Sequence, residues 1–329
     1  MTNKLLTVIL VSSLCFLSQK LAAQQDFYLS QSFVNPSLVN PGLTALQDGP
    51  EVALFNRHQW IGSGTSPNTQ VLVLSSTYKK PKYLKTGGRS SSAKYARKRS
   101  SKKGKLFHAF NFMLINDHAG AFSKIDSRLH WSPQIRLTKN IYAGIGPTVS
   151  FSRFQINPTK LNFADGTDES WAQMQSNGLS NSSANISFGG NVFSKDFCFG
   201  VTFSDALNQT WIGSEIPALR VDRNLIFNGS YKYNINEIYS VEAAAASRYT
   251  FGAPLDHSIN VRAVYNNQFW AGLGFRTSPA LNFSAGAFIN QKFKIAYTAE
   301  RSFVGIPGIG LTHELYVSFT IPTSKYSKF

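Results

Sequence analysis

The stretch THELYVSFTI, residues 312–321, alternates between apolar and polar side chains. One set comprises Leu315, Val317, Phe319 and Ile321, and the other comprises Glu314, Tyr316, Ser318 and Thr320. Because successive side chains of an extended chain point to opposite faces, a period of two predicts a β-strand with one apolar face. The end of the chain therefore indicates a sheet protein.

The same alternation recurs along most of the chain. Leu281, Phe283, Ala285, Ala287 and Ile289 oppose Asn282, Ser284, Gly286 and Asn290, and Phe107, Ala109, Met113 and Ile115 share one side with Asn111. Such runs predict fourteen strands, near residues 51–60, 68–79, 106–116, 124–137, 141–154, 181–194, 197–204, 220–233, 238–250, 257–265, 268–277, 280–290, 293–301 and 312–322. Single-chain bacterial barrels favour an even number. We therefore predict an all-β fold, a transmembrane antiparallel β-barrel over residues 51–322.

Composition separates this prediction from a soluble β-sandwich, which is the alternative. Aromatic residues make up 13% of the chain and charged residues only 15%, so the strands have few charges to expose to water. The five tryptophans fall in loops or near predicted strand ends, as in an interfacial aromatic girdle; they are Trp60, Trp131, Trp171, Trp211 and Trp270. Composition therefore favours a barrel in lipid.

The connections predict an orientation. The turns at 139–140, 194–196, 234–237, 266–267 and 290–292 are tight, and the connections at 117–123, 155–180, 205–219, 251–256 and 302–311 are longer. Outer-membrane barrels have short periplasmic turns and longer external loops. Both chain ends, and the segment 79–105, are then expected on the periplasmic side.

The chain begins with the pattern of a secretory signal peptide over residues 1–23: Lys4, an apolar run, and Leu21-Ala22-Ala23 before Gln24. Residues 24–50 follow as an irregular N-terminal periplasmic segment, in which Asn35-Pro36 and Asn40-Pro41 favour extended and turn conformations over a helix. Residues 323–329 form a C-terminal tail. Without the signal peptide Cys198 is the one cysteine, which excludes a disulfide framework and a multi-cysteine metal site, and we expect no cofactor.

The basicity of the chain is concentrated in one stretch. Twelve of the 33 Lys and Arg residues and none of the 17 Asp and Glu residues lie in 79–105: Lys79, Lys80, Lys82, Lys85, Arg89, Lys94, Arg97, Lys98, Arg99, Lys102, Lys103 and Lys105. A run so poor in apolar residues predicts a loop inserted into the barrel. Three interpretations of this stretch are contact with an acidic periplasmic partner, contact with anionic lipid, and a solvated loop without a partner. Nucleic-acid binding is disfavoured, because a secreted chain does not meet cytoplasmic nucleic acid.

Candidate catalytic chemistry is sparse. Arg57, Gln59 and Trp60 end the first strand and predict a structural network in the lumen, or bidentate pairing of Arg57 with a partner. His313 and Glu314 open the last strand, but no G-x-S-x-G nucleophile motif accompanies them. Residues 165–169, DGTDE, are interpreted as a solvated acidic turn, with a calcium site as the alternative. We expect no enzyme activity.

Several short motifs, taken together and in order, resemble the PorP/SprF family. They are F-x-x-S-Q at 27–31, two Asn-Pro pairs, RHQWIG at 57–62, G-x-x-P-x-T at 64–69, NDHAG at 116–120, FWAGLGFR at 269–276 and G-x-T-H-E at 310–314. The residues that carry the resemblance are Asn35, Pro36, Asn40, Pro41, Arg57, Gln59, Trp60, Gly62, Gly64, Pro67, Asp117, Gly120, Trp270, Gly272, Arg276, His313 and Glu314. The long basic insert and Phe55-Asn56-Arg57, where an aromatic often directly precedes Arg, depart from the family pattern.

This resemblance implies an outer-membrane component of the type IX secretion and gliding machinery of Bacteroidota, without known catalysis. It implies as partners a secreted substrate or adhesin and periplasmic or lipoprotein components of the machinery, with outer-membrane lipid around the barrel. We therefore expect a barrel that anchors or docks a secreted surface protein and contacts periplasmic machinery. A passive porin for small solutes is the alternative.

Overall fold

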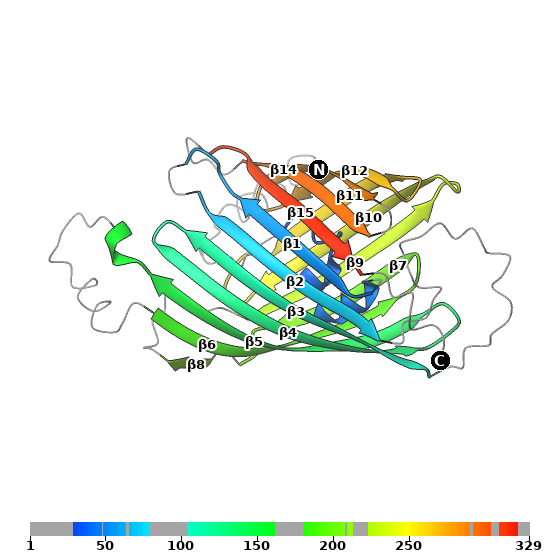
Figure 1. Cartoon of the computed structure of the whole chain (residues 1–329), viewed down its shortest axis with the longest axis horizontal. Helices are drawn as coiled ribbons and strands as arrows, with labels where there is room; N and C mark the ends of the chain where they lie inside the picture. The colour runs from blue at the N-terminus through cyan, green and yellow to red at the C-terminus, as the bar shows by residue number, and fades with distance from the viewer. Residues whose placement is uncertain are drawn as a thin grey trace, which may run out of the picture.

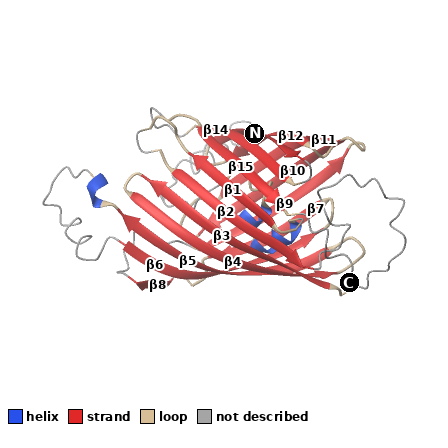
Figure 2. Cartoon of the chain, viewed as in Figure 1, coloured by secondary structure: helices blue, strands red, loops and turns tan. Residues whose placement is uncertain are grey.

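The computed structural model describes residues 29–47, 49–63, 66–78, 104–161, 180–207, 209–212, 223–289, 292–303 and 309–321. These residues form an elongated antiparallel barrel that surrounds a short segment near the start of the chain (Figures 1 and 2). Within these residues no helix is long and apolar enough to cross a bilayer.

The strands of the described chain number fifteen. They are β1 (Glu51–His58), β2 (Asn68–Tyr78), β3 (Leu106–Ala119), β4 (Phe122–Arg136), β5 (Tyr142–Ile156), β6 (Ser180–Phe193), β7 (Phe197–Ser204), β8 (Gln209–Ile212), β9 (Asn224–Asn234), β10 (Tyr239–Thr250), β11 (Asp256–Tyr265), β12 (Phe269–Arg276), β13 (Ala280–Ile289), β14 (Phe293–Ser302) and β15 (Thr312–Thr320). Three 3-10 helices accompany them: η1 (Pro36–Leu38), η2 (Pro41–Leu46) and η5 (Pro158–Lys160). Each of the fourteen predicted strands is present.

Every strand pairs antiparallel with its neighbours, and two pairings close the sheet. β1 pairs with β15, and β5 pairs with β6. β7 pairs with Phe188–Phe193 of β6, and β8 continues that line by pairing with Ser182–Ala184 of the same strand. The barrel therefore has fourteen strand positions, one of them divided between β7 and β8, as the alternation predicted.

Two predicted loops are wrong in part. β8 lies inside 205–219, which we expected to be loop throughout. The predicted connection 117–123 is almost entirely strand, because β3 runs to Ala119 and β4 starts at Phe122. Gly120 has a φ of 59°, which favours glycine and permits a turn of two residues here.

The barrel has two rims. The turn rim carries the connections β4–β5, β6–β7, β9–β10, β11–β12 and β13–β14, together with the start of β1 and the end of β15. The loop rim carries the connections β1–β2, β3–β4, β5–β6, β7–β9, β10–β11, β12–β13 and β14–β15. By strand direction the basic stretch 79–105 joins β2 to β3 at the turn rim; apart from Gly104 and Lys105 it lies outside the described residues.

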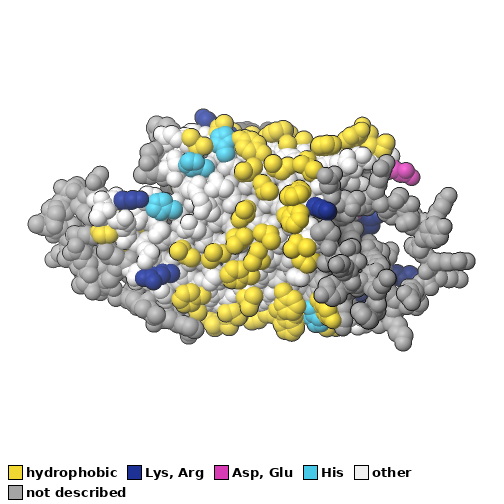
Figure 3. Space-filling view, viewed as in Figure 1, with side chains coloured by type: hydrophobic (Ala, Val, Ile, Leu, Met, Phe, Trp, Pro, Cys, Tyr) yellow, Lys and Arg dark blue, Asp and Glu magenta, His cyan; other side chains and the backbone are white. Residues whose placement is uncertain are grey.

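The barrel is apolar outside and polar inside. Leu315 and Val317 of β15 are 46% and 38% exposed, whereas Glu314 and Ser318 are nearly fully buried. Figure 3 shows apolar side chains spread over the outer wall. A water-soluble sandwich would bury such residues, so this inverted arrangement excludes the sandwich and fits a barrel whose outer wall faces hydrocarbon.

The N-terminal segment differs from the prediction. Residues 29–47, which we call the plug, lie inside the barrel rather than projecting from it (Figure 1). They contain η1 and η2, although the Asn-Pro pairs were expected to exclude a helix. Each helix starts at the proline of an Asn-Pro pair, where the missing N–H costs nothing and the fixed φ is already helical.

The plug also explains two apolar side chains that point inward. Phe107 and Ala109 of β3 pack with Leu43 and Ala45 of the plug, so the apolar face predicted for 106–116 lines the lumen. Trp270 is 4% exposed and faces inward, which contradicts its place in an aromatic girdle. Trp131 does lie on the outer wall, and Trp171 lies outside the described residues.

Candidate functional site

The interior of the barrel holds the densest set of buried polar contacts in the described chain. The plug enters near β14 and β15 and reaches the opposite wall at β4, β5 and β6. It is fixed at two anchors, one built from ion pairs and one from amides.

The first anchor is Arg57 held between two carboxylates. Arg57 is 2% exposed; its Nη2 donates to Glu300 at 2.8 Å, and its Nη1 pairs with Glu314. The plug completes the cluster, because the Ser30 backbone N–H donates to Glu314 at 2.9 Å and the Ser30 hydroxyl donates to Glu300 at 2.7 Å. Gln31 donates its backbone N–H to Glu314 at 3.3 Å. One buried charge cluster therefore joins β1, β14 and β15 to the plug.

The second anchor holds the plug on the far wall. The Asn40 side-chain amide donates to the carbonyl of Gly190 at 3.0 Å and to Asn228 at 3.2 Å. The Gly42 carbonyl accepts three side-chain hydrogen bonds, from Ser132 at 2.7 Å, Gln134 at 2.8 Å and Asn191 at 2.6 Å. Gly42 itself is buried.

The second anchor depends on close backbone approach. A Cβ added at Gly146 of β5 would collide with the backbone of Gly42, and one added at Gly189 of β6 would collide with the Asn40 side chain. Glycine at these wall positions lets η2 lie directly on the sheet. The wall is shaped to receive the plug at this point.

Aromatic and cationic contacts hold the middle of the plug. The rings of Phe33 and Trp270 meet edge to face with centroids 5.1 Å apart, and the Arg262 guanidinium lies 4.6 Å from the Phe33 centroid. Arg262 also pairs with Glu242 of β10. Such contacts contribute on the order of 0.5–1.5 kcal/mol each beyond the area they bury.

A separate lumen cluster lies at the turn rim. Glu51 accepts from Lys294 at 2.6 Å and from the Tyr316 hydroxyl at 3.0 Å, and Tyr316 is fully buried. Like the Arg57 cluster, it joins the first strand to the last two. The seam where β1 meets β15 is therefore closed by charge pairing on its inner face as well as by the β ladder.

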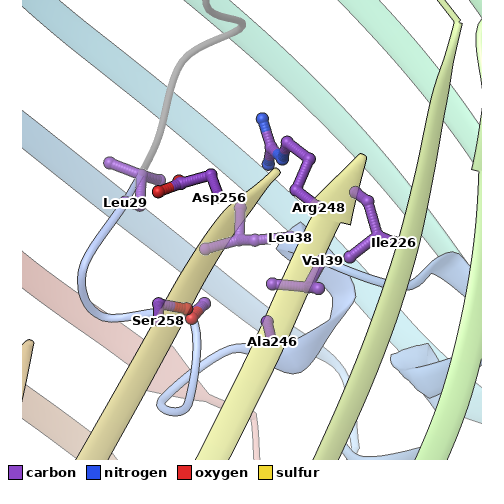
Figure 4. Close-up of a pocket in the computed structure, with 9 residues that line it drawn as sticks. Leu29, Leu38, Val39, Ile226, Ala246, Arg248, Asp256 and Ser258 are labelled. Carbon is purple, nitrogen blue, oxygen red and sulfur yellow. The ribbon is translucent and has the colours of Figure 1, made fainter. Parts of the chain in front are cut away.

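A pocket remains between the plug and the wall formed by β9, β10 and β11. Figure 4 shows Leu38 and Val39 of the plug facing Ile226 and Ala246, with Arg248 and Asp256 beside them. The pocket combines an apolar lining with one cation and one carboxylate. Among the described residues, no group of three His, Cys, Asp or Glu could hold a metal ion.

Most of the sequence-predicted site residues meet at the plug. Arg57, Glu314 and Arg276 join the first anchor, with Arg276 donating to Glu300 at 3.2 Å. Asn40 and Pro41 form part of the second anchor, and Trp270 contacts Phe33. Asn35 and Pro36 stand at the start of η1, where the Asn35 side chain accepts hydrogen bonds from the side chains of Ser37 and Gln47. Gly272 lies on the inner face of β12.

The other predicted residues lie elsewhere. Gln59, Trp60, Gly62 and Pro67 belong to the β1–β2 connection at the loop rim, where Gln59 donates its backbone N–H to Pro67 at 2.8 Å. Asp117 accepts from Thr69 at 2.6 Å, and Gly120 forms the β3–β4 turn. His313 points outward and contacts Tyr297. Gly64, residues 165–169 and the basic residues before Lys105 lie outside the described part of the chain.

Sequence reasoning missed Ser30, Gly42 and Glu300. Glu300 offered a signal, because an acid within a predicted strand of so weakly charged a chain has to face the polar interior. Ser30 belongs to the F-x-x-S-Q motif, but neither it nor Gly42 offered a signal for its contacts with the wall, since Ser30 meets Glu300 and Gly42 meets Ser132 across 270 and 90 residues.

The comparisons agree with this architecture. A family model described as type IX secretion system membrane protein PorP/SprF matches residues 21–319. The chain belongs to the PorP/SprF family. Among curated proteins no sequence matches it.

Solved structures similar to this PorP/SprF protein are outer-membrane barrels. The CymD monoaromatic hydrocarbon channel has a TM-score of 0.52 at 10% identity, with 90% of this chain and 94% of that chain covered. The Ralstonia pickettii toluene transporter TbuX has a TM-score of 0.49 at 8% identity, covering 87% and 93%. The Acinetobacter baumannii outer membrane protein Omp33 has a TM-score of 0.47 at 9% identity, covering 84% and 100%. This PorP/SprF protein is thus an outer-membrane β-barrel of the type IX secretion system, and its family and fold are those of secretion proteins and porin-like barrels.

Proposed function

We propose that this PorP/SprF protein is a non-enzymatic scaffold of the type IX secretion and gliding machinery, exported by a signal peptide over residues 1–23. In this proposal the loop rim faces the cell exterior and docks a secreted surface protein. The turn rim faces the periplasm and contacts components of the machinery. The filled lumen is the observation that carries the proposal.

A filled lumen supports scaffolding over transport. The plug bridges opposite walls, and its anchors include a buried ion cluster, three side-chain bonds to one carbonyl, and a packed aromatic pair. Ser30 and Gln31 of the plug donate to the buried carboxylates of Glu300 and Glu314, and hydrogen bonds to charged groups contribute roughly 1.5–3 kcal/mol each, so the plug is not released by small fluctuations. A barrel closed in this way offers its rims, rather than its interior, to partners.

The two rims differ in what they present. The connection 157–179 follows β5 and the connection 205–223 follows β7, both at the loop rim. The basic stretch 79–105 joins β2 and β3 at the turn rim, where a cluster of Lys and Arg suits an acidic protein partner. By this argument external loops select the secreted protein, and the basic stretch contacts periplasmic or lipoprotein components.

A detergent pull-down of the tagged protein from native outer membranes tests the proposal, with partners identified by mass spectrometry. Recovery of one large secreted protein supports a dedicated anchor, and recovery of periplasmic ring and lipoprotein subunits supports a place in the core machinery. A variant in which a Gly/Ser linker replaces 162–178 serves as the matched control, because it should lose the secreted protein while retaining the barrel. A barrel recovered with neither class of partner would overturn the scaffold.

The alternative function is a passive porin for small solutes, which the polar inner wall and the CymD-like fold favour. Planar-bilayer recording distinguishes the two functions. A scaffold with a seated plug is silent, whereas steady ohmic conductance of the unchanged protein would support the porin.

A further inference from the structure

One side of the outer wall becomes polar before it reaches the loop rim. On β1 the outward residues change from Val52 and Leu54 to Asn56 and His58 as the strand approaches this rim. On β3 the outward Phe110, Phe112 and Leu114 give way to Asn116 and His118. Because of the strand register, the polar outward residues of neighbouring strands lie side by side and form one polar band.

The band is continuous from β15 to β5. His58 is paired with both His313 of β15 and Asn68 of β2, and Asn68 is in turn paired with His118 of β3. Ser123 of β4 and Gln155 of β5 extend the row. The row beneath it holds Asn56, Gln70, Asn116 and Arg153, and it is interrupted by Leu315 of β15 and Ile125 of β4.

The opposite side of the barrel is mainly apolar near the loop rim, although Ser247 of β10 and His257 of β11 point outward there and contact each other at 2.8 Å. On β10, β12 and β13 the outward residues nearest the loop rim are Tyr249, Phe275 and Leu281, which are 41%, 47% and 50% exposed. The polar band is therefore a property of one side of the wall. Figure 3 shows histidine and basic side chains at the left end of the view, beside the apolar surface.

The band is cationic, and no carboxylate faces it from the described strands. Their seven Asp and Glu residues all lie at inward positions of the alternation: Glu51, Asp117, Asp126, Glu242, Asp256, Glu300 and Glu314. Arg153 and Arg301 point outward, are exposed, and form no ion pair with a described residue. Lys160, which ends η5, places its Nζ 3.5 Å from the Nε2 of His118.

We propose that this band, centred on His118, Arg153 and Lys160, binds the phosphate groups of anionic lipids in the leaflet at the loop rim. The band stands immediately beyond the apolar wall, at the level where headgroups replace hydrocarbon. Arg153 supplies a planar fork for phosphate oxygens, and Lys160 supplies a point charge beside the His118 ring. Because no carboxylate of the described strands points outward, none of them competes with a lipid phosphate for Arg153 and Lys160. The inference goes beyond the scaffold and does not depend on which leaflet this is.

Native mass spectrometry of the full chain tests the proposal. The protein is released from nanodiscs containing phosphatidylcholine with either phosphatidylglycerol or lipid A, and retained lipids are counted. The variant H118Q/R153Q/K160Q should retain these anionic lipids about 25-fold or more weakly than the unchanged protein, at about 5-fold for each lost cation. Equal retention by the two proteins would overturn the proposal.

A matched control separates the band from net charge. K139Q/K195Q/K292Q removes three exposed lysines from turn-rim connections, and it should retain anionic lipid like the unchanged protein. If this control loses as much lipid, the band is not a site. Inorganic phosphate is added as competitor; displacement of lipid by millimolar phosphate would instead assign the band to free phosphate and overturn the lipid assignment. Cold SDS gel mobility confirms that each variant folds.

Discussion

Arg57→Met tests the claim that the buried ion cluster holds the plug. The substitution keeps an unbranched side chain of similar reach and removes the cation between Glu300 and Glu314. Breaking a buried ion pair by removing one partner costs about 3–5 kcal/mol, because the remaining charge stays desolvated.

The structure indicates that the cost of Arg57→Met lies at the lower end of this 3–5 kcal/mol range. Glu300 keeps Arg276 at 3.2 Å, and Glu314 keeps the backbone N–H of Ser30 at 2.9 Å. Each carboxylate therefore retains a donor after Arg57 is removed. We expect a loss of about 3 kcal/mol in the free energy of unfolding.

Two assays measure this loss. Urea unfolding in detergent gives the change in stability, and planar-bilayer recording detects intermittent opening as the plug leaves. The matched control is R57M/E314Q, which leaves Glu300 paired with Arg276 and removes the charge of Glu314, and it should recover most of the lost stability, since an uncharged amide needs no counterion. A change of less than about 0.5 kcal/mol in R57M, with a silent barrel, would refute the reasoning, because a change that small is typical of surface substitutions.

Three further changes test the plug, and one tests the basic stretch. Deleting residues 29–47 should convert a silent barrel into one with steady conductance, and a silent deletion variant would contradict a plug-filled lumen. Asn40→Ala should lower the free energy of unfolding by roughly 2 kcal/mol in urea titration, because three amide hydrogen bonds are lost; an unchanged midpoint would count against the second anchor. Gly146→Val should cost about 1–3 kcal/mol by overlap with the plug, whereas Gly190→Ala, with nothing within 4 Å of the added Cβ, should be nearly neutral; equal effects would show that the wall there is not shaped for the plug. Deleting 80–104 should leave a heat-modifiable barrel but weaken co-purification of periplasmic partners, and unchanged recovery would argue against a contact role.

Local chemistry made the strands predictable. The alternation in 312–321 depends only on the geometry of an extended chain, and β15 has its apolar residues outside and Glu314, Tyr316 and Ser318 inside. The strand count followed because the pattern repeats, and the low charge of the strands separated a lipid-facing wall from a sandwich. The basic stretch was visible from composition alone.

The candidate site was predictable only in part. Arg57 and Glu314 could be selected as motif residues at strand ends, but their pairing could not, because Arg57 meets Glu300 and Glu314 across 243 and 257 residues. Trp270 was placed in a girdle because aromatic residues near strand ends commonly lie at the interface. The ring faces inward because Phe33 of the plug offers it a partner there.

The sequence by itself determined that the chain is an antiparallel barrel of fourteen strand positions, since side-chain direction along a strand is a local property. Tertiary structure alone decided that residues 29–47 occupy the lumen. That outcome depends on whether the closed wall offers partners for the buried backbone groups and side chains of the plug. Ser132, Gln134 and Asn191 supply such partners from two strands. The sequence around Gly42 does not predict these contacts.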